Sequence, residues 1–378
     1  MAFAHGLSDF YSGIVPFVIF FVVTREHLSP AYQGVLGFVW YLTSSVVQPL
    51  FGAYSDRRGR WWFLPTAVLL TVVAVSFAGS AHTVPTLALC IVFGGFGSAI
   101  THPEAGKYSA MLSGARKAGG ISIFQIGGQI GYAIGPAVVA VLLARFGGAG
   151  TLWLIAPGIL ATLMLFAAMR RVDRSAVHAH HSASRGVARP GEPPDRLGVG
   201  LLVASTGLRY FTNAAFMTYL PNVLVGRGAS LPEAGQVVSA FLLVSAIGLF
   251  AGGYLADRWG TVPVCVASLA AAVPCFVGFF AFGGIASIGL LLCAAILLAM
   301  QNAPGVALVQ AMLPRNLGMA LGLMNGVAFG AGSALVATIG FTVARIGAPS
   351  ALLAVAFVPL IAALPYLVVG RRGAVARA

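Results

Sequence analysis

Gly52-Ala-Tyr-Ser-Asp-Arg-Arg-Gly-Arg60 is a dense cluster of charges between two long apolar runs, and the rest of the chain is organised around it. A looser copy, Gly252-Gly-Tyr-Leu-Ala-Asp-Arg-Trp-Gly260, follows 200 residues later (252 − 52). This spacing is slightly more than half of the 378 residues. Such a repeat predicts a chain built from two similar halves.

Two further landmarks keep nearly the same register. Gly6-Leu-Ser-Asp-Phe10 matches Gly207-Leu-Arg-Tyr-Phe211 at a shift of 201 (207 − 6). His102-Pro103 falls on Ala303-Pro304 at that same shift (303 − 102). Three landmarks in one register are hard to obtain by chance, so they predict a duplication that extends over most of the chain.

The composition excludes a water-soluble protein. Hydrophobic residues make up 59% and charged residues 8% of the chain, and the mean hydropathy is +0.93. Apolar runs of about 20 residues recur, which is the length of helix that crosses a bilayer. We therefore expect an all-α polytopic membrane protein with twelve transmembrane helices, at roughly residues 3–24, 31–54, 62–80, 85–107, 119–144, 151–169, 197–224, 233–256, 262–282, 285–311, 318–344 and 350–369.

The net charge of +13 is a signal of topology. Most Lys and Arg residues fall in loops on one side of the predicted spans, whereas the other side carries only Arg25, Arg145, Arg227 and Arg345. Positive loops stay in the cytoplasm. We therefore expect a multi-pass protein of the bacterial cytoplasmic (inner) membrane with both termini in the cytoplasm. Its charge then faces lipid headgroups and no nucleic acid.

A polar, basic, proline-containing stretch separates six predicted spans from the other six. It predicts a cytoplasmic linker at 170–196 between an N-terminal six-helix lobe (1–169) and a C-terminal six-helix lobe (197–370), with a cytoplasmic tail at 371–378. Parallel repeats of this kind make two-lobed transporters with a binding site between the lobes. The sequence thus predicts two pseudo-symmetric lobes around a transport site.

The motifs resemble those of a known family. Gly52-x3-Asp56-Arg57-Arg58-Gly59-Arg60 resembles the loop between helices 2 and 3 of the major facilitator superfamily. Phe96-Gly-Ser-Ala-Ile-Thr-His-Pro-Glu104, Ser122-Ile-Phe-Gln-Ile-Gly-Gly128 and the His-x3-Asp of helix 1 resemble its fosmidomycin-resistance branch. The resemblance implies the major facilitator fold, a central cavity lined by helices 1, 4, 7 and 10, and proton-driven export of drugs or metabolites. We expect a monomer.

The resemblance also implies a gate on the cytoplasmic side, formed by the two charged loops. A glycine lets another helix approach closely, and an Asp can face a helix N-terminus. The alternative is that the loop charges are only positive-inside anchors. The second copy has Trp259 in place of a basic residue, so its contribution to the gate should be weaker. The expected gate residues are Gly52, Asp56, Arg57, Arg60, Asp257 and Arg258.

Charged side chains within the apolar helices are candidates for proton coupling. A charge at the centre of a bilayer costs about 2.5–3.5 kcal/mol, so such residues normally face a cavity or a partner. His5 and Asp9 are four residues apart and share a helix face, while His102 and Glu104 lie on helix 4. We predict that these four residues carry protons. For Glu104, pairing with Lys107 is the alternative.

The second half has different chemistry at the equivalent positions. Arg209 lies within helix 7, and the repeat sets it opposite Ser8, one position from Asp9. A guanidinium suits bidentate binding of a carboxylate or phosphonate, so we predict that Arg209 contacts an anionic substrate and depends on Asp9 as its counter-charge. A static pair, or an Arg bound to a helix carbonyl, is the alternative. Further predicted substrate contacts are Gln125, Gln129, Tyr11, Asn213, Gln301 and Asn302. The alternatives are hydrogen bonding between helices for the amides and aromatic packing for Tyr11.

Two glycine stripes predict close helix packing: Gly127, Gly131 and Gly135 on helix 5, and Gly318, Gly322, Gly326 and Gly330 on helix 11. No metal site and no cofactor other than the proton gradient are expected. The four cysteines have no ligand spacing, and His178, His180 and His181 lie in the polar linker.

The sequence therefore favours a secondary active transporter. We expect proton-coupled export (antiport, efflux) of a small drug-like or anionic compound by alternating access, with drug resistance as a consequence. A proton-coupled importer of a small metabolite and a membrane ligand sensor without transport stay open as alternatives. An enzyme is not expected, because no activated nucleophile, metal-ligand spacing or nucleotide loop accompanies the intramembrane charges.

Overall fold

The structure is a computed structural model that describes residues 1–58, 60–113, 117–171, 195–313, 319–320 and 322–371. Every regular element in these ranges is helical. The first half contains α1 (Ala2–Arg25), α2 (Ala31–Tyr41), η1 (Leu42–Val46), α3 (Gln48–Arg58), α4 (Phe63–Ala78), α5 (Val84–Leu112), α6 (Lys117–Phe146), η2 (Gly147–Leu154) and α7 (Ile155–Met169). The second contains α9 (Arg196–Gly226), α10 (Leu231–Trp259), α11 (Thr261–Ala281), α12 (Gly284–Ala299), α13 (Asn302–Met312), η3 (Gly322–Val327), α15 (Ala328–Ile346), α16 (Ala348–Val355) and α17 (Val358–Arg371).

Each of the twelve expected ranges contains helix where it is described, so the predicted all-α membrane fold is confirmed. Nine segments of the described chain are long and apolar enough to cross a membrane. One of them, Ser122–Met169, is long enough for two spans, and Phe63–Ala78 is a shorter apolar helix. With α9, whose 31 residues are also long enough to cross a membrane, the described helices are consistent with twelve spans.

In three of the expected spans the helix is irregular or broken just before a proline. Proline has no N–H, and its ring clashes with the carbonyl four residues earlier. Pro49 follows the π-helix η1, Pro304 follows the break between α12 and α13, and Pro359 follows the break between α16 and α17. The breaks therefore come from local sequence and place irregular backbone inside apolar spans.

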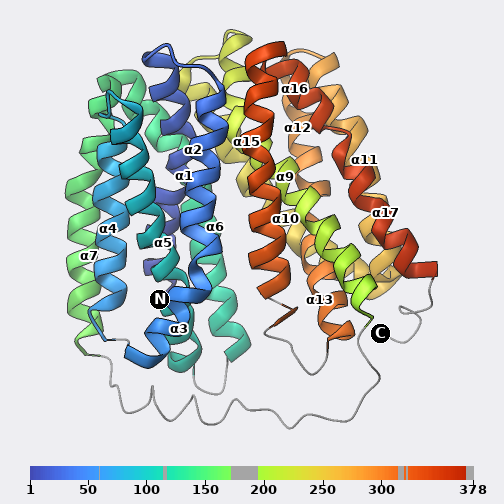
Figure 1. Ribbon diagram of the computed structural model, residues 1–378, viewed down its shortest axis with the longest axis horizontal. Helices are drawn as coiled ribbons and strands as arrows, with labels where there is room; N and C mark the ends of the chain where they lie inside the picture. Colours follow the sequence, from blue (N-terminus) through green and yellow to red (C-terminus); the bar gives the residue numbers. More distant parts are fainter. Residues whose placement is uncertain (59, 114–116, 172–194, 314–318, 321, 372–378) are drawn as a thin grey trace. The chain divides into compact units, whose positions relative to one another are not determined.

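The chain forms two compact units. One comprises Met1–Ala188 and Gly228–Ser239, and the other comprises Arg189–Arg227 and Ala240–Ala378. In the first unit α1 packs along α6 and against α4 and α5, and in the second α9 packs against α15 and α17 (Figure 1). The first helix of each half is thus its central element.

The start of α10 belongs with the first unit, which the predicted lobe boundaries do not anticipate. The Ser239 hydroxyl accepts a hydrogen bond from the backbone N–H of Ala137 at 2.9 Å. A Cβ on Gly235 would lie 2.7 Å from the Pro136 carbonyl oxygen, so these two helix backbones are in close contact.

The glycine stripe on α6 packs closely, as predicted. A Cβ on Gly127 or Gly131 would overlap the backbone carbonyls of Ala2 and Gly6 on α1, and one on Gly135 would lie 2.6 Å from the Phe10 carbonyl oxygen. This close approach brings α6 side chains onto the N-terminal turns of α1.

The prediction for helix 11 is wrong at two positions. Gly322 and Gly326 face open space, and the close contact is made instead by Gly332, whose Cβ would overlap the Gly207 carbonyl of α9. Gly318 lies outside the described residues. The stripe has a spacing typical of an α-helix, but residues 322–327 form a π-helix, whose wider turn does not keep that spacing on one face.

One device is repeated at the end of α1 and of α9. Arg25 donates to the Gly79 carbonyl at 2.8 Å and to that of Ala81. Arg227 donates to the Phe279 carbonyl at 3.0 Å and lies over the Phe279 ring. In each half an arginine therefore ties the end of the first span to the end of the third.

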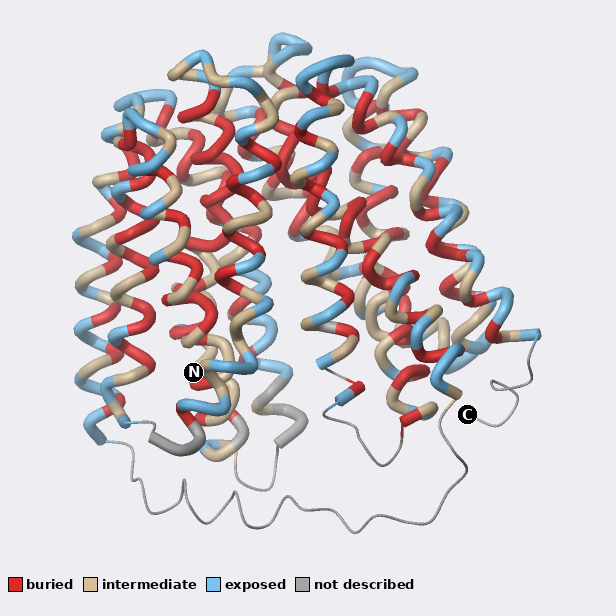
Figure 2. Tube along the Cα trace, in the orientation of Figure 1, coloured by how far each residue is buried: buried red, intermediate tan, exposed pale blue. Residues whose placement is uncertain are grey.

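Burial follows the pattern of a membrane protein. Figure 2 shows buried residues concentrated inside each unit, and exposed ones on outer faces and at helix ends. Many large apolar side chains lie on the exposed faces, including Leu160, Phe250 and Ile285. An apolar patch of this extent indicates a membrane-embedded surface.

Candidate functional site

Three polar side chains meet inside the first unit. The Nε2 atom of His5 lies 3.1 Å from Oδ2 of Asp9, one turn further along α1. The Nε2 atom of His102, on α5, lies 3.0 Å from Oδ1 of the same carboxylate. The two imidazoles are arranged edge to face with centroids 5.1 Å apart. Asp9 therefore has one histidine on each of its oxygens.

The second nitrogen of each imidazole is also engaged. Nδ1 of His5 lies 2.8 Å from the Phe124 carbonyl oxygen, and Nδ1 of His102 lies 2.8 Å from that of Ser98. A carbonyl oxygen can only accept, so each Nδ1 must carry hydrogen. A neutral imidazole then turns its Nε2 lone pair toward the carboxylate. Each contact with Asp9 consequently needs a proton, or another cation, between the two atoms.

Helix α6 holds His5 in place. The Phe124 ring stacks on the imidazole with centroids 4.0 Å apart. Gly128 lies on the same helix one turn later, and a Cβ there would overlap the imidazole. Only glycine leaves room for the ring at this position. The sequence did not predict Ser98 and Gly128 as site residues, although Gly128 ends the Ser122–Gly128 motif.

The cluster is buried without being sealed. The side chains of His5, Asp9 and His102 are 6%, 15% and 28% exposed. Asp9 therefore lies in an apolar helix packing that weakens its hydration, and His102 is its most accessible partner. This arrangement suits exchange of a small cation through the His102 side.

Glu104 does not join this cluster. Its side chain is 1% exposed, and its Oε1 accepts from the Lys107 Nζ atom at 2.8 Å. Lys107 also donates to the Ser55 hydroxyl of α3 at 2.7 Å. The alternative that pairs Glu104 with Lys107 is thus the arrangement observed. The reason is geometric, because residues 104 and 107 lie one turn apart on α5, whereas Glu104 lies two residues from His102.

Arg209 is buried on α9 of the second unit. It is 4% exposed, and its Nε and Nη2 atoms have no hydrogen-bond partner among the residues described. The guanidinium carbon lies 4.0 Å from the centroid of the Tyr210 ring. Stacking on an aromatic ring stabilises a cation but leaves N–H groups unused. Arg209 therefore has donors to offer to an anion.

A neutral polar network lies in the same unit. The Gln301 amide donates to the Thr206 hydroxyl at 3.1 Å and to the Tyr366 hydroxyl at 2.5 Å. Gln301 is fully buried between α12 and α13, and its Oε1 has no partner among the described residues. The network ties α9 and α17 to the interrupted tenth span.

The other predicted contacts divide into two groups. Tyr11 is buried, and its hydroxyl donates to the Leu154 carbonyl at 2.5 Å, which gives it a packing role inside the first unit in place of the predicted substrate contact. Gln125 and Gln129 are exposed on α6, while Asn213 and Asn302 are partly buried.

The predicted gate is only partly visible. The side chains of Asp56 and Arg57 lie outside the described residues, and Arg60 is exposed. Asp257 and Arg258 are also exposed, and Arg258 donates to the Tyr254 hydroxyl at 3.2 Å.

The two loop glycines differ from expectation. A Cβ on Gly52 would make an ordinary 3.5 Å contact with Pro103, so no glycine is required there. A Cβ on Gly252 would overlap the Met300 carbonyl. The close helix approach predicted for the first copy therefore occurs in the second.

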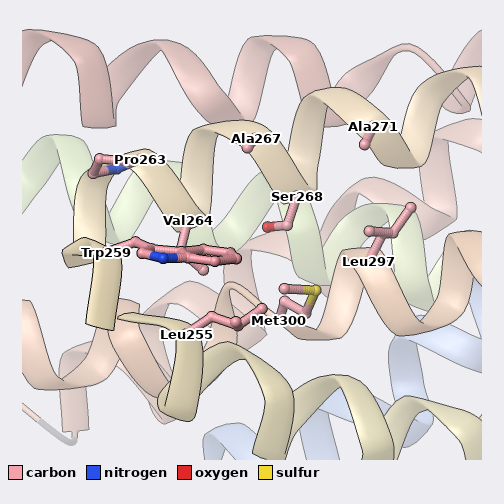
Figure 3. Close-up of a pocket in the computed structure, with 9 residues that line it drawn as sticks. All are labelled: Leu255, Trp259, Pro263, Val264, Ala267, Ser268, Ala271, Leu297 and Met300. Atoms are coloured by element: carbon pink, nitrogen blue, oxygen red, sulfur yellow. The ribbon is translucent and has the colours of Figure 1, made fainter. Parts of the chain in front are cut away.

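An apolar cavity of about 420 Å³ opens on the second unit. Figure 3 shows Trp259 and Leu255 on one side of it, with Val264, Leu297 and Met300 around them. The hydroxyl of its one serine, Ser268, donates to the Cys265 carbonyl. The cavity thus suits hydrocarbon and offers little to a charged solute.

Comparison with known proteins accounts for this architecture. The chain matches the Major Facilitator Superfamily over residues 1–197 and 202–377. It is 28% identical to the "Uncharacterized MFS-type transporter YfnC" of Bacillus subtilis (strain 168), over 96% of this chain and 90% of the relative. It is 26% identical to the "Fosmidomycin resistance protein" of Escherichia coli (strain K12), with the same two shares covered.

Solved structures share the fold. A bacterial homologue of the human lysosomal transporter Spinster, inward-facing and unoccupied, matches with a TM-score of 0.77 at 17% identity, over 98% of this chain and 95% of that one. The nucleoside transporter NupG matches with a TM-score of 0.71 at 14% identity, over 98% of each chain. With the family match over nearly its whole length, this multi-pass membrane transporter, which is not an enzyme, belongs to the Major Facilitator Superfamily.

Proposed function

We propose that this transporter is a proton-coupled exporter of a small anionic or drug-like compound and works by alternating access. The observation that carries the proposal is the pair of contacts between Asp9 and the two imidazoles. Each contact places two hydrogen-bond acceptors face to face unless a proton lies between them. The observed distances therefore require a shared proton in each of the two contacts.

Loss of a proton would change helix packing. The contact between His102 and Asp9 joins α5 to α1, whereas the contact between His5 and Asp9 lies within α1. When the shared proton leaves His102, its lone pair opposes a carboxylate oxygen at 3.0 Å and the contact turns repulsive. Proton release thus weakens the α1–α5 attachment, which is the kind of two-state contact that a transport cycle can use.

The substrate chemistry is inferred from the second unit. A guanidinium that is 4% exposed and has unused N–H groups favours a bidentate anion such as a carboxylate or phosphonate. The name of the 26% identical relative refers to resistance to an antibiotic, which favours export. Arg209 would bind the anion, and the buried amide of Gln301 would contribute to the polar surroundings.

For the link between the two clusters we propose an arrangement other than the pair predicted from the repeat. Within the first unit, each oxygen of Asp9 contacts an imidazole. Within the second, Arg209 lies over the Tyr210 ring. We propose that proton and anion act on separate groups, and that coupling passes through helix movement.

Transport driven by an imposed pH gradient tests the proposal. Purified protein is reconstituted into liposomes, and movement of fosmidomycin, as the probe anion, is followed after a pH jump of either sign. Export by antiport predicts that the probe moves against the proton flow. Movement together with the protons would show the importer, and no gradient-driven movement of any anion tested would show the sensor.

The matched variants are Asp9→Asn and Glu26→Gln. Asn keeps the shape of Asp9 but is neutral and takes up no proton: its amide NH2 can donate to one imidazole without a shared proton, and its oxygen stabilises a protonated imidazole far less than a carboxylate does. Gradient-driven movement should therefore fall to that of empty liposomes. Glu26 is partly exposed in a loop and should be dispensable. If Asp9→Asn still concentrates the probe as well as the Glu26→Gln control, the cluster does not couple protons to transport.

A further inference from the structure

We propose that His5, Asp9 and His102 also form a binding site for a divalent transition-metal ion of the Zn²⁺ type, which takes the place of the protons and blocks the transport cycle. The block rests on the proposed function, because it assumes that the cluster moves protons. Binding of the metal ion itself does not depend on that function. No spacing of residues in the sequence predicts this site, because its ligands come from two helices.

The ligand atoms are already close to a coordination arrangement. Two ligand atoms about 2.1 Å from one Zn²⁺ ion, at angles between octahedral and tetrahedral, lie about 3.0–3.4 Å apart. The distances from the two Nε2 atoms to the oxygens of Asp9 are 3.1 Å and 3.0 Å. All the ligand atoms lie within 4.8 Å of one another, so the two imidazoles would need to draw closer together around the ion.

The hydrogen bonds behind the ligands favour a metal ion. Histidines that bind metals usually donate their other N–H to a carbonyl or carboxylate, which fixes the ring and its tautomer. Here Nδ1 of His5 faces the Phe124 carbonyl and Nδ1 of His102 faces the Ser98 carbonyl, each at 2.8 Å. Both rings therefore point their Nε2 lone pairs inward in the neutral form, without any rearrangement of tautomer.

The charge and the burial of the cluster agree with a divalent ion. With one carboxylate and two neutral imidazoles as ligands, a divalent ion keeps a net positive charge. A water or hydroxide can then complete its coordination as a fourth ligand. His5 stacks on Phe124, which fixes one ligand, and His102 is 28% exposed, which gives the ion a way in.

The donor set also predicts selectivity. Imidazole nitrogen suits Zn²⁺, Co²⁺ and Ni²⁺, whereas Mg²⁺ and Ca²⁺ prefer oxygen ligands. Two histidines and one carboxylate should therefore bind zinc in preference to magnesium. This selectivity separates a built site from general attraction of cations to Asp9.

Other histidines of the chain must be separated from this site. His82 lies 3.2 Å from Glu26, but the pair is a single histidine with a single carboxylate and His82 is 77% exposed. His178, His180 and His181 stand close together in the sequence, outside the described residues. Both groups could bind zinc weakly in solution, so each supplies a control.

Zinc binding to the full-length purified protein tests the proposal. Isothermal titration with Zn²⁺ should give one site that weakens about tenfold or more in His5→Gln, His102→Gln and Asp9→Asn. His82→Gln, and the combined replacement of His178, His180 and His181 by Gln, should leave that site unchanged. Binding that survives all three cluster variants, or that disappears with the linker histidines, overturns the proposal.

A second measurement does not require any variant of the cluster to fold. Co²⁺ bound by nitrogen and oxygen ligands absorbs visible light without the strong charge-transfer band of a cobalt–thiolate bond. Protein in which His82, His178, His180 and His181 are replaced by Gln should show this thiolate-free spectrum and lose it on addition of Zn²⁺. A thiolate band would assign the metal to a cysteine, and no spectrum would show that no site exists.

Transport separates this inference from the proposed function. Zn²⁺, but not Mg²⁺, should inhibit gradient-driven transport by the wild-type protein at concentrations that fill the titrated site. If zinc binds at the cluster and no gradient-driven transport is found, the metal site stands and the proposed function fails. If gradient-driven transport occurs and zinc does not bind at the cluster, the metal site fails alone.

Discussion

The two buried polar clusters differ in the kind of charge they hold. In the first unit, Asp9 lies between His5 and His102, so every member can gain or lose a proton. In the second, the guanidinium of Arg209 lies over the Tyr210 ring, and Gln301 and Tyr366 form a neutral network in the same unit. The duplicated scaffold is shared, and the chemistry placed on it is not.

The register of the repeat makes this difference concrete. At the shift of 201, Arg209 corresponds to Ser8 and His102 to Ala303. The charged side chain of one half is therefore absent from the equivalent position of the other half. A duplicated helix packing offers buried positions at similar places in the two halves. Filling one with a carboxylate and two imidazoles and the other with a guanidinium lets one chain handle cations and anions separately.

The largest expected effect is at Arg209. Arg209→Ala should weaken binding of an anionic substrate by about 1.5–3 kcal/mol, the usual range for a hydrogen bond to a charged group. Arg209→Lys keeps the charge but lacks the planar pair of donors, so binding should fall between the wild type and Arg209→Ala. Fluorescence or calorimetric titration with the transported anion measures both, and Asp9→Asn should bind it as the wild type does.

This result can break the comparison between the units. If Asp9→Asn loses anion affinity as severely as Arg209→Ala, the two clusters act as one site, and the division between cation and anion is wrong. If Arg209→Ala binds the anion as tightly as the wild type, the second cluster is structural.

The second effect concerns Gly128. A Cβ at this position would overlap the His5 imidazole, which cannot retreat because Phe124 stacks on its ring. Gly128→Ala should therefore displace His5 and lower gradient-driven transport about as much as His5→Gln. Gly106→Ala on α5 is the control, since no atom lies within 4 Å of its added Cβ. Equal transport by the two alanine variants would contradict the fixed position of His5.

A smaller effect is expected for the neutral network. Tyr366→Phe removes the hydroxyl that accepts from Gln301, so the buried amide loses a partner. The free energy of unfolding should fall by about 1–3 kcal/mol. Tyr254→Phe removes an exposed acceptor of Arg258 and should change stability little. Thermal unfolding of both variants in one detergent compares them, and equal midpoints would refute a stabilising role of the network.

The smallest effect distinguishes the repeated arginines. Arg25 lies 2.7 Å from Glu26 and holds the pKa of that carboxyl below its usual value. A lowered pKa contributes stability that is present above the ordinary value, about pH 4.3, and is lost as pH falls through the folded value. Arg227 has glycine on both sides and no such neighbour.

Glu26→Gln should therefore flatten the acid limb of the thermal stability profile slightly, because an exposed ion pair contributes little. Arg227→Gln should lower stability at every pH without changing that limb, since its bonds are to a backbone carbonyl and a hydroxyl. Unfolding midpoints measured from pH 3 to pH 7 test both, with identical acid limbs for wild type and Glu26→Gln as the contrary result.

Sequence reasoning succeeded where the relation between residues is local. Helix periodicity and length predicted the spans, and the spacing of four placed His5 beside Asp9 on one face of α1. The ion pair of Glu104 and Lys107 could be considered from the sequence because the two residues are three apart on one helix.

It failed where two helices must meet. The contact of His102 with Asp9, the clamp of Gly128 on His5 and the bond from Tyr366 to Gln301 all depend on how helices rotate against one another. Tyr11 shows the same limit, because an aromatic residue on α1 can face either a cavity or a neighbouring helix. The metal-binding geometry went unpredicted for this reason, since its ligands stand far apart in the chain.

The repeated arginine device has a consequence for how the protein is made. Arg25 finds its carbonyl partner at Gly79, 54 residues later, and Arg227 finds its partner at Phe279, 52 residues later. During synthesis each guanidinium therefore leaves the ribosome well before the backbone that will bind it. The first and third spans of a half can be tied together only after the third has been inserted. In each half the bond between the first and third spans is therefore a late contact, which cannot form until three spans are in the membrane.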